Sequence, residues 1–441
     1  MKKILLWLLL AAVLTLPVQA EEMTTTVLLY VAGDDLESVD GIAMEDFAEL
    51  IYTDIAEEGP IRVLALTGGC EYWWYEWIPT DYPTVHSFDS HAMWPVNEWE
   101  PANMGDPETL RQFIRYGLDF DPSDRTILVL WGHGDGPVGG VCSDGLYDGD
   151  FLTMDELEAA LDGAMGEGEM LDAVIFDSCL IASVDYAEML DGYAKYMVAS
   201  QDTTVGTGLR YDKWVGALTD NPGIPTEELC RIAAETYAAD NNHGRFGENA
   251  TMSVMDLQYA QETADAVDAL YAKLMTLLEE DESAVLDRRA QLVSFGEHDG
   301  DEPSDQVDAK QVIDAFRDVA PEECARLEEC LEKLVICNAV TDDMAGKACG
   351  LSLMMPYAAG SWSWEIEDWY MLTEDESAYS ALNVILARMA GERYKEENSM
   401  SGLFEDFSVG GFVGDMKEAV STIKEIMTPE DPSDMWEGFT P

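Results

Sequence analysis

The amino-acid sequence predicts an α/β protein with a mostly parallel β-sheet flanked by helices and a helix-rich C-terminal part. Two observations support this fold class. Short apolar runs alternate with segments of helical periodicity, as in sheets whose strands are covered by helices on both faces. Of the 441 residues, 47% are hydrophobic, which is enough to fill a large interior and argues against global disorder.

Residues 1–20 are expected to form a signal peptide. Two lysines precede an apolar run from Ile4 to Leu16, and small residues end the segment at Ala20. This order is typical of secretory signals, and the apolar run is too short to span a bilayer comfortably. We therefore expect a secreted protein that is cut after Ala20 and then has no stable association with a membrane.

The first half of the chain contains the strand–helix alternation. Five apolar runs are predicted strands: Val27–Ala32, Ile61–Leu66, Ile127–Trp131, Ala173–Phe176 and Met197–Ala199. Helical periodicity predicts helices over approximately Asp106–Leu118, Met154–Met165, Leu180–Tyr196 and Thr226–Ala239. The acidic residues that follow Thr153 suit the first turn of the second of these helices.

The second half is richer in helical pattern. Leu257–Leu278 predicts a long amphipathic helix, and Asp308–Leu334 predicts helix interrupted at Pro321. Gly350–Pro356 predicts one more buried strand. Residues 396–441 are polar, then glycine-rich, then proline- and acid-rich, which predicts a flexible acidic tail.

The charge of the chain limits its partners. Asp and Glu number 88 and Lys and Arg number 24, so the net charge is −64. Such a surface repels phosphates and anionic lipid, so nucleic acid is not an expected partner. It favours cationic substrates and divalent cations.

Eight cysteines are present, and none form a CxxC pair, so a zinc or thioredoxin-type site is unsupported. Export would permit a disulfide within the cluster from Cys324 to Cys349. The dense aromatic run from Tyr72 to Trp77 predicts a strand or hairpin with one face packed on the core.

Two residues beyond strand ends have complementary chemistry. His133 follows Ile127–Trp131 and is flanked by glycines, and Cys179 follows Ala173–Phe176. Functional groups of open parallel sheets lie beyond the carboxyl ends of the strands. The helix predicted after Cys179 would lower the pKa of its thiol. A cysteine nucleophile and a histidine base are what thiol acyl transfer requires.

The backbone N–H groups of Gly134 and Cys179 could then hold the oxyanion. Without further information, a polar loop histidine and a buried structural cysteine are the alternatives for these two positions.

The order of these segments resembles the clostripain-like cysteine peptidases, which share the caspase-type fold. The specific part is Leu130–Gly134 (LWGHG) followed by Asp177–Ser183 (DSCLIAS), each after an apolar strand. Supporting segments are Leu29–Glu37, Val198–Gln201, Thr251–Leu257 and Gly350–Leu353, and the resemblance covers about Val27 to Arg393.

The resemblance implies a role for each site residue. His133 would be the general base, Cys179 the nucleophile, and Asp177 the acid that pairs with an Arg or Lys at the P1 position of the substrate. A carboxylate can bind a guanidinium through two parallel hydrogen bonds, which is a sound reason for a P1 Arg preference. Family members often carry a second acid in the loop after the Val-Ala-Ser strand, and Asp202 is the acid present in Gln201–Gly208.

The resemblance also implies a domain plan and a mode of activation. Residues 24–250 would be the caspase-like catalytic core, and residues 251–395 the mixed α/β remainder of the peptidase domain. Several relatives are activated by a cut after a basic residue between the His and the Cys. From Gly134 to Ser178 the sequence has no Lys or Arg, so we expect one uncut chain, acting as a monomer.

No cofactor is expected for the thiol chemistry, but some family members require calcium. The acids Asp144, Asp148, Asp150 and Asp155 have a spacing similar to an EF-hand loop. Leu146 stands at position three of the loop, where a ligand is needed, and the last ligand is Asp rather than Glu, so a true EF-hand is not expected. A calcium site elsewhere stays open, with ligands unknown.

The leading interpretation is a secreted cysteine endopeptidase that cleaves peptides and proteins after Arg or Lys. A non-catalytic secreted binding protein on the same fold is the first alternative, and an unprocessed inactive precursor is the second. A metal-dependent hydrolase using the Asp-rich loops is weakly supported, because the five histidines are not clustered.

Overall fold

The computed structural model describes residues 23–120, 122–242, 249–296, 304–357, 363–372 and 377–398. Contacts divide the chain into one unit up to Met355 and a second from Pro356. The expected signal peptide, most of the expected acidic tail, and His243 and His298 lie outside the described residues. Among the helices that are described, none has both the length and the apolar character needed to cross a bilayer.

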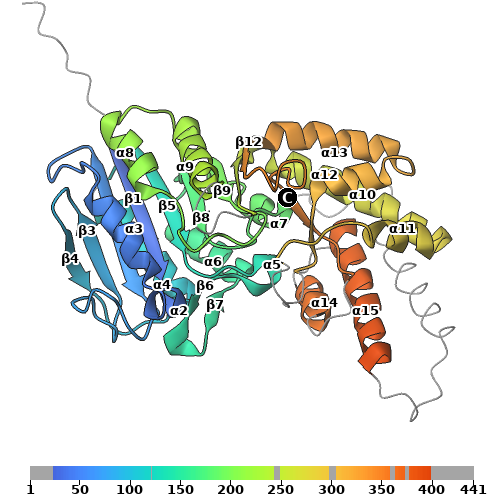
Figure 1. Ribbon diagram of the computed structural model, residues 1–441, viewed down its shortest axis with the longest axis horizontal. Helices are drawn as coiled ribbons and strands as arrows, with labels where there is room; N and C mark the ends of the chain where they lie inside the picture. The colour runs from blue at the N-terminus through green and yellow to red at the C-terminus, as the bar shows by residue number, and fades with distance from the viewer. Residues whose placement is uncertain are drawn as a thin grey trace, which may run out of the picture. The chain divides into compact units, whose positions relative to one another are not determined.

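The first unit is an α/β structure built on one large sheet (Figure 1). Its strands are β1 (Thr25–Ala32), β2 (Ile61–Gly68), β3 (Thr84–Phe88), β4 (Met93–Glu98), β5 (Arg125–Trp131), β8 (Ala173–Asp177), β9 (Tyr196–Ala199), β10 (Thr251–Asp256) and β12 (Val335–Val340). Two small sheets pair β6 (Val141–Asp144) with β7 (Asp150–Leu152), and β11 (Gln306–Asp308) with β13 (Ser352–Met354).

Helices connect these strands. They are α2 (Asp34–Ser38), α3 (Ile42–Ile51), α4 (Pro107–Phe120), α5 (Gly136–Gly139), α6 (Met154–Ala164), α7 (Val184–Met189), α8 (Tyr211–Asp220), α9 (Thr226–Asn241), α10 (Ala260–Glu280), α11 (Glu282–Arg289), α12 (Ala309–Phe316) and α13 (Pro321–Leu334). Short 3-10 turns, η2 (Gly145–Tyr147) and η3 (Leu257–Tyr259), complete the unit. The second unit contains α14 (Ser363–Leu372) and α15 (Ala378–Asn398).

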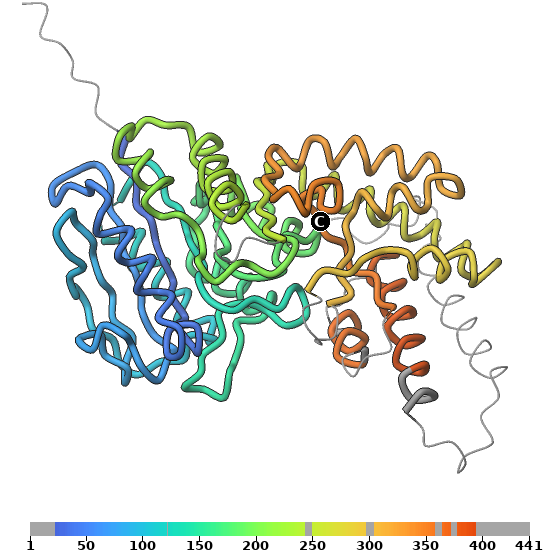
Figure 2. Tube along the Cα trace, in the orientation of Figure 1, coloured from blue at the N-terminus to red at the C-terminus, as the bar shows by residue number. Residues whose placement is uncertain are grey.

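The strand order of the large sheet is β12-β10-β9-β8-β5-β1-β2-β3-β4. The five central strands, from β9 to β2, are parallel, whereas β3 and β4 extend one edge and β10 and β12 the other in antiparallel pairing. Figure 2 follows the chain through this sheet. The predicted strands and the mostly parallel sheet flanked by helices are confirmed.

The sheet is apolar on both faces, which explains the unbroken apolar runs of its central strands. One face packs against α3, α8 and α9, where Phe47 and Trp214 are fully buried beside Val27 and Val129. On the other face, α4 approaches β1 so closely that a Cβ at Gly117 would lie 2.2 Å from Leu28. A glycine at this position therefore lets the helix lie directly on the strand.

Several predicted helix boundaries are confirmed and have clear local causes. Helix α6 begins with a capping box, in which the Thr153 hydroxyl accepts from the Glu156 N–H and the Glu156 carboxylate accepts from the Thr153 N–H. The break at Pro321 is real, because α12 ends at Phe316 and Pro321 opens α13.

Two predictions of local structure are wrong. The run from Tyr72 to Trp77 is a loop rather than a strand or hairpin, although Trp73 is buried and stacks on Phe47. The predicted helix Leu180–Tyr196 is reduced to the six residues of α7, Val184–Met189. The reason lies at the candidate site, where the backbone after Cys179 is hydrogen-bonded to Ser200 and to Ser352.

Candidate active site

Adjacent strand ends bring His133 and Cys179 to the same edge of the sheet. Strands β5 and β8 are parallel neighbours, and Trp131 is paired with Asp177 at their carboxyl ends. His133 and Cys179 each lie two residues further along. A Cβ on Gly134 would lie 2.3 Å from the Cys179 carbonyl oxygen and 2.9 Å from the Cys179 nitrogen. The two turns therefore touch, and this contact requires a glycine after the histidine.

The turn at Cys179 does not lead into a helix. Leu180 adopts a left-handed conformation with φ 65°. The Ala182 N–H then donates to the Ser200 carbonyl at 2.8 Å, and the Ser352 N–H donates to the Ala182 carbonyl at 2.7 Å. Because the backbone after the cysteine is held on both sides by these partners, α7 starts only at Val184.

The Cys179 thiol is therefore not activated by a helix N-terminus, contrary to the sequence-based expectation. Its sulfur accepts the Thr204 backbone N–H at 3.1 Å and lies 3.3 Å from the Thr204 hydroxyl. Burial raises the pKa of the thiol, and the charges of Asp202 and Asp177 raise it further, which outweighs the opposite effect of the Thr204 hydrogen bonds. In the free protein the thiol is held protonated.

The His133 ring has a carboxylate partner. Its Nε2 lies 2.6 Å from Oδ1 of Asp35, which belongs to the short helix α2 directly after β1. Strand β1 is the neighbour of β5, so the ends of three adjacent strands contribute Asp35, His133 and Cys179 in spatial order. Asp35 was not identified as a site residue from the sequence.

Asp177 is buried at the end of β8, and a second carboxyl group lies beside it. Both the Leu209 N–H and the Tyr211 hydroxyl donate to its Oδ2, at 3.1 Å and 3.0 Å. Asp46 of α3 is also buried, and its Oδ2 accepts from Trp131 Nε1 at 2.8 Å. A Cβ on Gly208 would lie 3.0 Å from Asp177 Oδ2 and 3.3 Å from Asp46 Oδ2, so both acids face one glycine.

The ionised forms of the two buried carboxyl groups are unfavourable in the free protein. Burial raises the pKa of Asp177 to about 6. Burial also raises the pKa of Asp46, and the charge of Asp177 adds to this effect. The donors that reach Asp177 are a backbone amide and a phenol, both neutral. A cation placed beside Gly208 would stabilise the ionised forms of Asp177 and Asp46.

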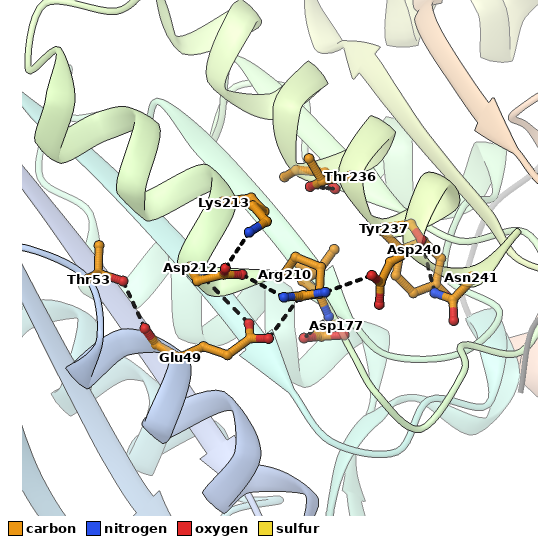
Figure 3. A network of polar contacts seen from close by, with 12 residues as sticks. Glu49, Thr53, Asp177, Arg210, Asp212, Lys213, Thr236, Tyr237, Asp240 and Asn241 are labelled. Atoms are coloured by element: carbon orange, nitrogen blue, oxygen red, sulfur yellow. Dashed lines mark hydrogen bonds and ion pairs between the residues drawn. The ribbon is translucent and has the colours of Figure 1, made fainter. Parts of the chain in front are cut away.

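The loop between β9 and α8 is fixed by Arg210, whose guanidinium lies among three carboxylates from three helices (Figure 3). It pairs with Glu49 at 2.8 Å, Asp212 at 3.2 Å and Asp240 at 2.7 Å. Because Arg210 directly follows Leu209, this cluster anchors the N–H group that binds Asp177.

Asp202, the acid proposed from the sequence as the second P1 contact, has a different set of contacts. Its Oδ1 accepts from the Thr203 N–H at 2.9 Å and from the Gly296 N–H at 3.0 Å. Its carbonyl accepts from Leu180 at 3.2 Å. Asp202 thus joins the loop after β9 to Gly296, whereas Asp46 is the acid that accompanies Asp177.

The Asp-rich segment is a hairpin of β6, η2 and β7 and not a helix–loop–helix. The Asp144 carboxylate is buried and accepts from the N–H groups of Met104 and Leu146, both within 2.8 Å. Asp155 belongs to the first turn of α6. Across the described ranges, no three His, Cys, Asp or Glu side chains are grouped so that they could hold a metal ion.

The eight cysteines are all unpaired, so the cluster from Cys324 to Cys349 contains no disulfide.

Comparisons with known proteins identify the family of the chain. A model of the clostripain family matches residues 29–381, which include all of the site residues described above.

The chain belongs to the clostripain family.

Clostripain from Hathewaya histolytica is 27% identical over 211 residues, which are 39% of this chain and 39% of clostripain. The chain thus matches less than half the length of that relative. A secreted C11 cysteine protease from Bacteroides thetaiotaomicron in complex with an irreversible peptide inhibitor has a TM-score of 0.58 at 17% identity, over 80% of this chain and 99% of that one.

An inactive zymogen C11 protease from Parabacteroides distasonis gives a TM-score of 0.59 at 20% identity, over 82% of this chain and 98% of that one. These structures confirm the caspase-like fold expected for a clostripain-family chain.

Proposed function

We propose that this clostripain-family chain is a secreted cysteine endopeptidase that hydrolyses peptide bonds after Arg or Lys. The observation that carries the proposal is the contact between the turns that follow β5 and β8, in which Gly134, next to His133, packs against the Cys179 backbone. Family membership supports the same chemistry. Peptides and proteins with basic residues would be the substrates.

The chemistry follows from the two side chains. His133 takes the thiol proton, and the Cys179 sulfur attacks the scissile carbonyl carbon and forms a C–S bond. The backbone N–H groups of Gly134 and Cys179 would bind the oxyanion. The C–N bond then breaks as His133 returns the proton to the leaving amine. Water, deprotonated by His133, hydrolyses the thioester and releases the acid and the thiol.

In this proposal the free protein represents the two side chains before the reaction. Each member is bonded to another group, Cys179 to Thr204 and His133 to Asp35. Catalytic hydrogen bonds commonly form only in the complex with substrate. The raised pKa of the thiol fits this sequence of events, since the proton would leave only when a substrate is in place.

The buried acids support a basic P1 residue. A guanidinium or ammonium group that reaches Asp177 and Asp46 along Gly208, which has no side chain, would neutralise two carboxylates that burial otherwise destabilises. Asp46 replaces Asp202 in this proposal as the second acid, because Asp202 faces Gly296.

The test is hydrolysis of fluorogenic peptide amides ending in Arg, Lys, Ala or Leu, under reducing conditions, with calcium or with a chelator. Cleavage of the Arg or Lys peptides that disappears in Cys179→Ala supports the proposal. Asp46→Asn should raise the KM for the Arg peptide about tenfold or more, and Asp202→Asn should not. Equal cleavage of all four peptides would reject the P1 assignment.

The absence of cleavage by a folded wild-type sample would favour the inactive precursor or the non-catalytic binding protein. The hydrogen bonds of Cys179 to Thr204 are the observation that keeps the precursor under consideration. Covalent labelling separates the two, because a precursor gains reactivity of Cys179 toward a peptide-based alkylating agent after limited proteolysis, and a binding protein does not.

Secretion, the monomeric state, the uncut chain and thiol chemistry that requires no cofactor are further parts of the proposal. N-terminal sequencing of exported protein should begin at Glu21, and an active sample should run as one band. Sedimentation tests the monomer, and the chelator arm of the peptide assay tests calcium. A band split between His133 and Cys179 in all active preparations would contradict the uncut chain.

A further inference from the structure

We infer that Asp35 is a positioning residue that orients the His133 ring for catalysis, an inference that rests on the proposed peptidase function. The two residues come from separate elements, α2 and the turn after β5. They meet because β1 and β5 are adjacent parallel strands with Val31 paired to Trp131. The resulting contact joins His133 Nε2 and Asp35 Oδ1 at 2.6 Å.

The contact selects one nitrogen of the ring. In a neutral imidazole one nitrogen carries the proton and the other is an acceptor, and the hydrogen bond made by one decides the state of the other. With Asp35 at Nε2, the proton is placed there and donated to the carboxylate. Nδ1 is then the unprotonated nitrogen and is the one that can accept the thiol proton of Cys179.

The same contact acts after the proton has moved. Once His133 holds two protons it is a cation, and a carboxylate 2.6 Å from Nε2 stabilises it without itself taking a proton. Asp35 thus acts through His133 and does not touch the substrate carbonyl.

The turn that carries Asp35 is held by other groups. Asp34 adopts a left-handed conformation with φ 39°, its N–H donates to the Gly69 carbonyl at 3.1 Å, and its carboxylate accepts from the Ser143 hydroxyl. The Gly33 N–H donates to the Gly68 carbonyl at 2.9 Å. The Asp35 side chain is 67% exposed, so its replacement should leave the turn and the fold intact.

This exposure also separates a catalytic effect from a structural one. Ion pairs between exposed side chains contribute little to folding stability. A large loss of turnover in a variant of unchanged stability would therefore report on the orientation of the ring. Because the pair is partly solvated, we expect a loss of about 10- to 100-fold, below the ~10⁴-fold known for fully buried Asp–His pairs.

The experiment compares Asp35→Ala, Asp35→Asn and a matched control, Asp148→Asn, in the peptide-amide assay on the full chain. Asp148 is an exposed acid in the neighbouring hairpin, and its replacement removes the same charge. We expect Asp35→Ala to lower kcat 10- to 100-fold with KM within about twofold, Asp35→Asn to fall between it and the wild type, and the control to be unchanged. An unchanged kcat in Asp35→Ala, or an equal loss in the control, would overturn the inference.

A second measurement does not depend on activity. In protein labelled with ¹⁵N-histidine at about pH 9, where histidine rings are neutral, the His133 signals should show the Nε2–H tautomer in the wild type. The bias should be lost in Asp35→Ala, with His133→Ala used to assign the signals. If the wild type cleaves no peptide, the proposed function fails while this measurement still tests Asp35. An unbiased tautomer in the wild type would reject the inference alone.

Discussion

Replacing Asp177 by Asn should stabilise the protein near neutral pH while it removes cleavage after basic residues. Burial raises the pKa of Asp177 from 3.8 to about 6, so the folded state binds this proton more tightly than the unfolded chain. The free energy of unfolding therefore falls as the pH rises from 3.8 to about 6, and stays low above that range. At ~1.4 kcal/mol per pKa unit, ionisation of Asp177 destabilises the fold by about 3 kcal/mol at pH 7.

The side chain is 5% exposed, so solvent screens this effect little. Asparagine suits the site because the Leu209 N–H and the Tyr211 hydroxyl both donate to Oδ2. An amide oxygen at that position would keep both hydrogen bonds, and the amide nitrogen would replace the other oxygen with almost no change in volume.

Urea unfolding at pH 7.5 and pH 4.5 measures the effect. Linkage predicts that the gain in stability of Asp177→Asn over the wild type is about 2 kcal/mol larger at pH 7.5 than at pH 4.5. The exposed variant Asp148→Asn should show no such difference. Destabilisation by Asp177→Asn of the same size at both pH values would refute the reasoning, since it would mean that Asp177 is held ionised by favourable contacts.

Three further changes have distinct expected outcomes. Gly134→Ala should lower kcat more than ~100-fold with a normal circular dichroism spectrum, because its Cβ would lie 2.3 Å from the Cys179 carbonyl oxygen; an active variant would contradict the contact. Arg125→Met should lower the free energy of unfolding in urea by about 3–5 kcal/mol, because the buried guanidinium donates to Thr25, Ile224 and Pro222. A stability equal to that of the wild type would show that these hydrogen bonds are unimportant. Thr204→Val should slow the alkylation of Cys179 several-fold, because loss of the hydroxyl hydrogen bond raises the pKa of the thiol. Mass spectrometry measures the alkylation, and faster alkylation would mean that Thr204 shields the thiol.

The positions of His133 and Cys179, the proposed dyad, could be predicted from the sequence because they depend on local signals. Apolar runs predicted β5 and β8, and the parallel arrangement then placed the residues after each strand at one edge. The helix after Cys179 could not be excluded in this way. Its sequence has helical periodicity, but Leu180 adopts a left-handed conformation and Ala182 pairs with Ser352, a partner 170 residues away in the chain.

The acids of the site also differ in how far local sequence could identify them. Asp177 lies two residues before the cysteine and could be identified by resemblance. Asp46 stands in a chain with 88 acidic residues, and nothing in its local sequence separates it from the rest. Asp35 does have a local signal, because it lies in the supporting segment Leu29–Glu37 just beyond the predicted strand Val27–Ala32, the same kind of position as those of His133 and Cys179. Asp46 becomes notable when the Trp131 indole donates to it and Gly208 opens beside it, and both contacts depend on the packing of α3 and the loop after β9.

The hydrogen bond from the Ser352 N–H to the Ala182 carbonyl has a consequence for how the chain folds while it is being synthesised. His133 and Cys179 have both been synthesised when about two fifths of the 441 residues have been made. The segment after Cys179 gains its second partner only when Ser352 has been added. A nascent or broken chain that stops before β13 has a segment after Cys179 that lacks one of its two hydrogen-bonding partners. Under the peptidase function proposed above, activity would appear only late in synthesis, and unfinished copies would not cleave other proteins in the cell that makes them.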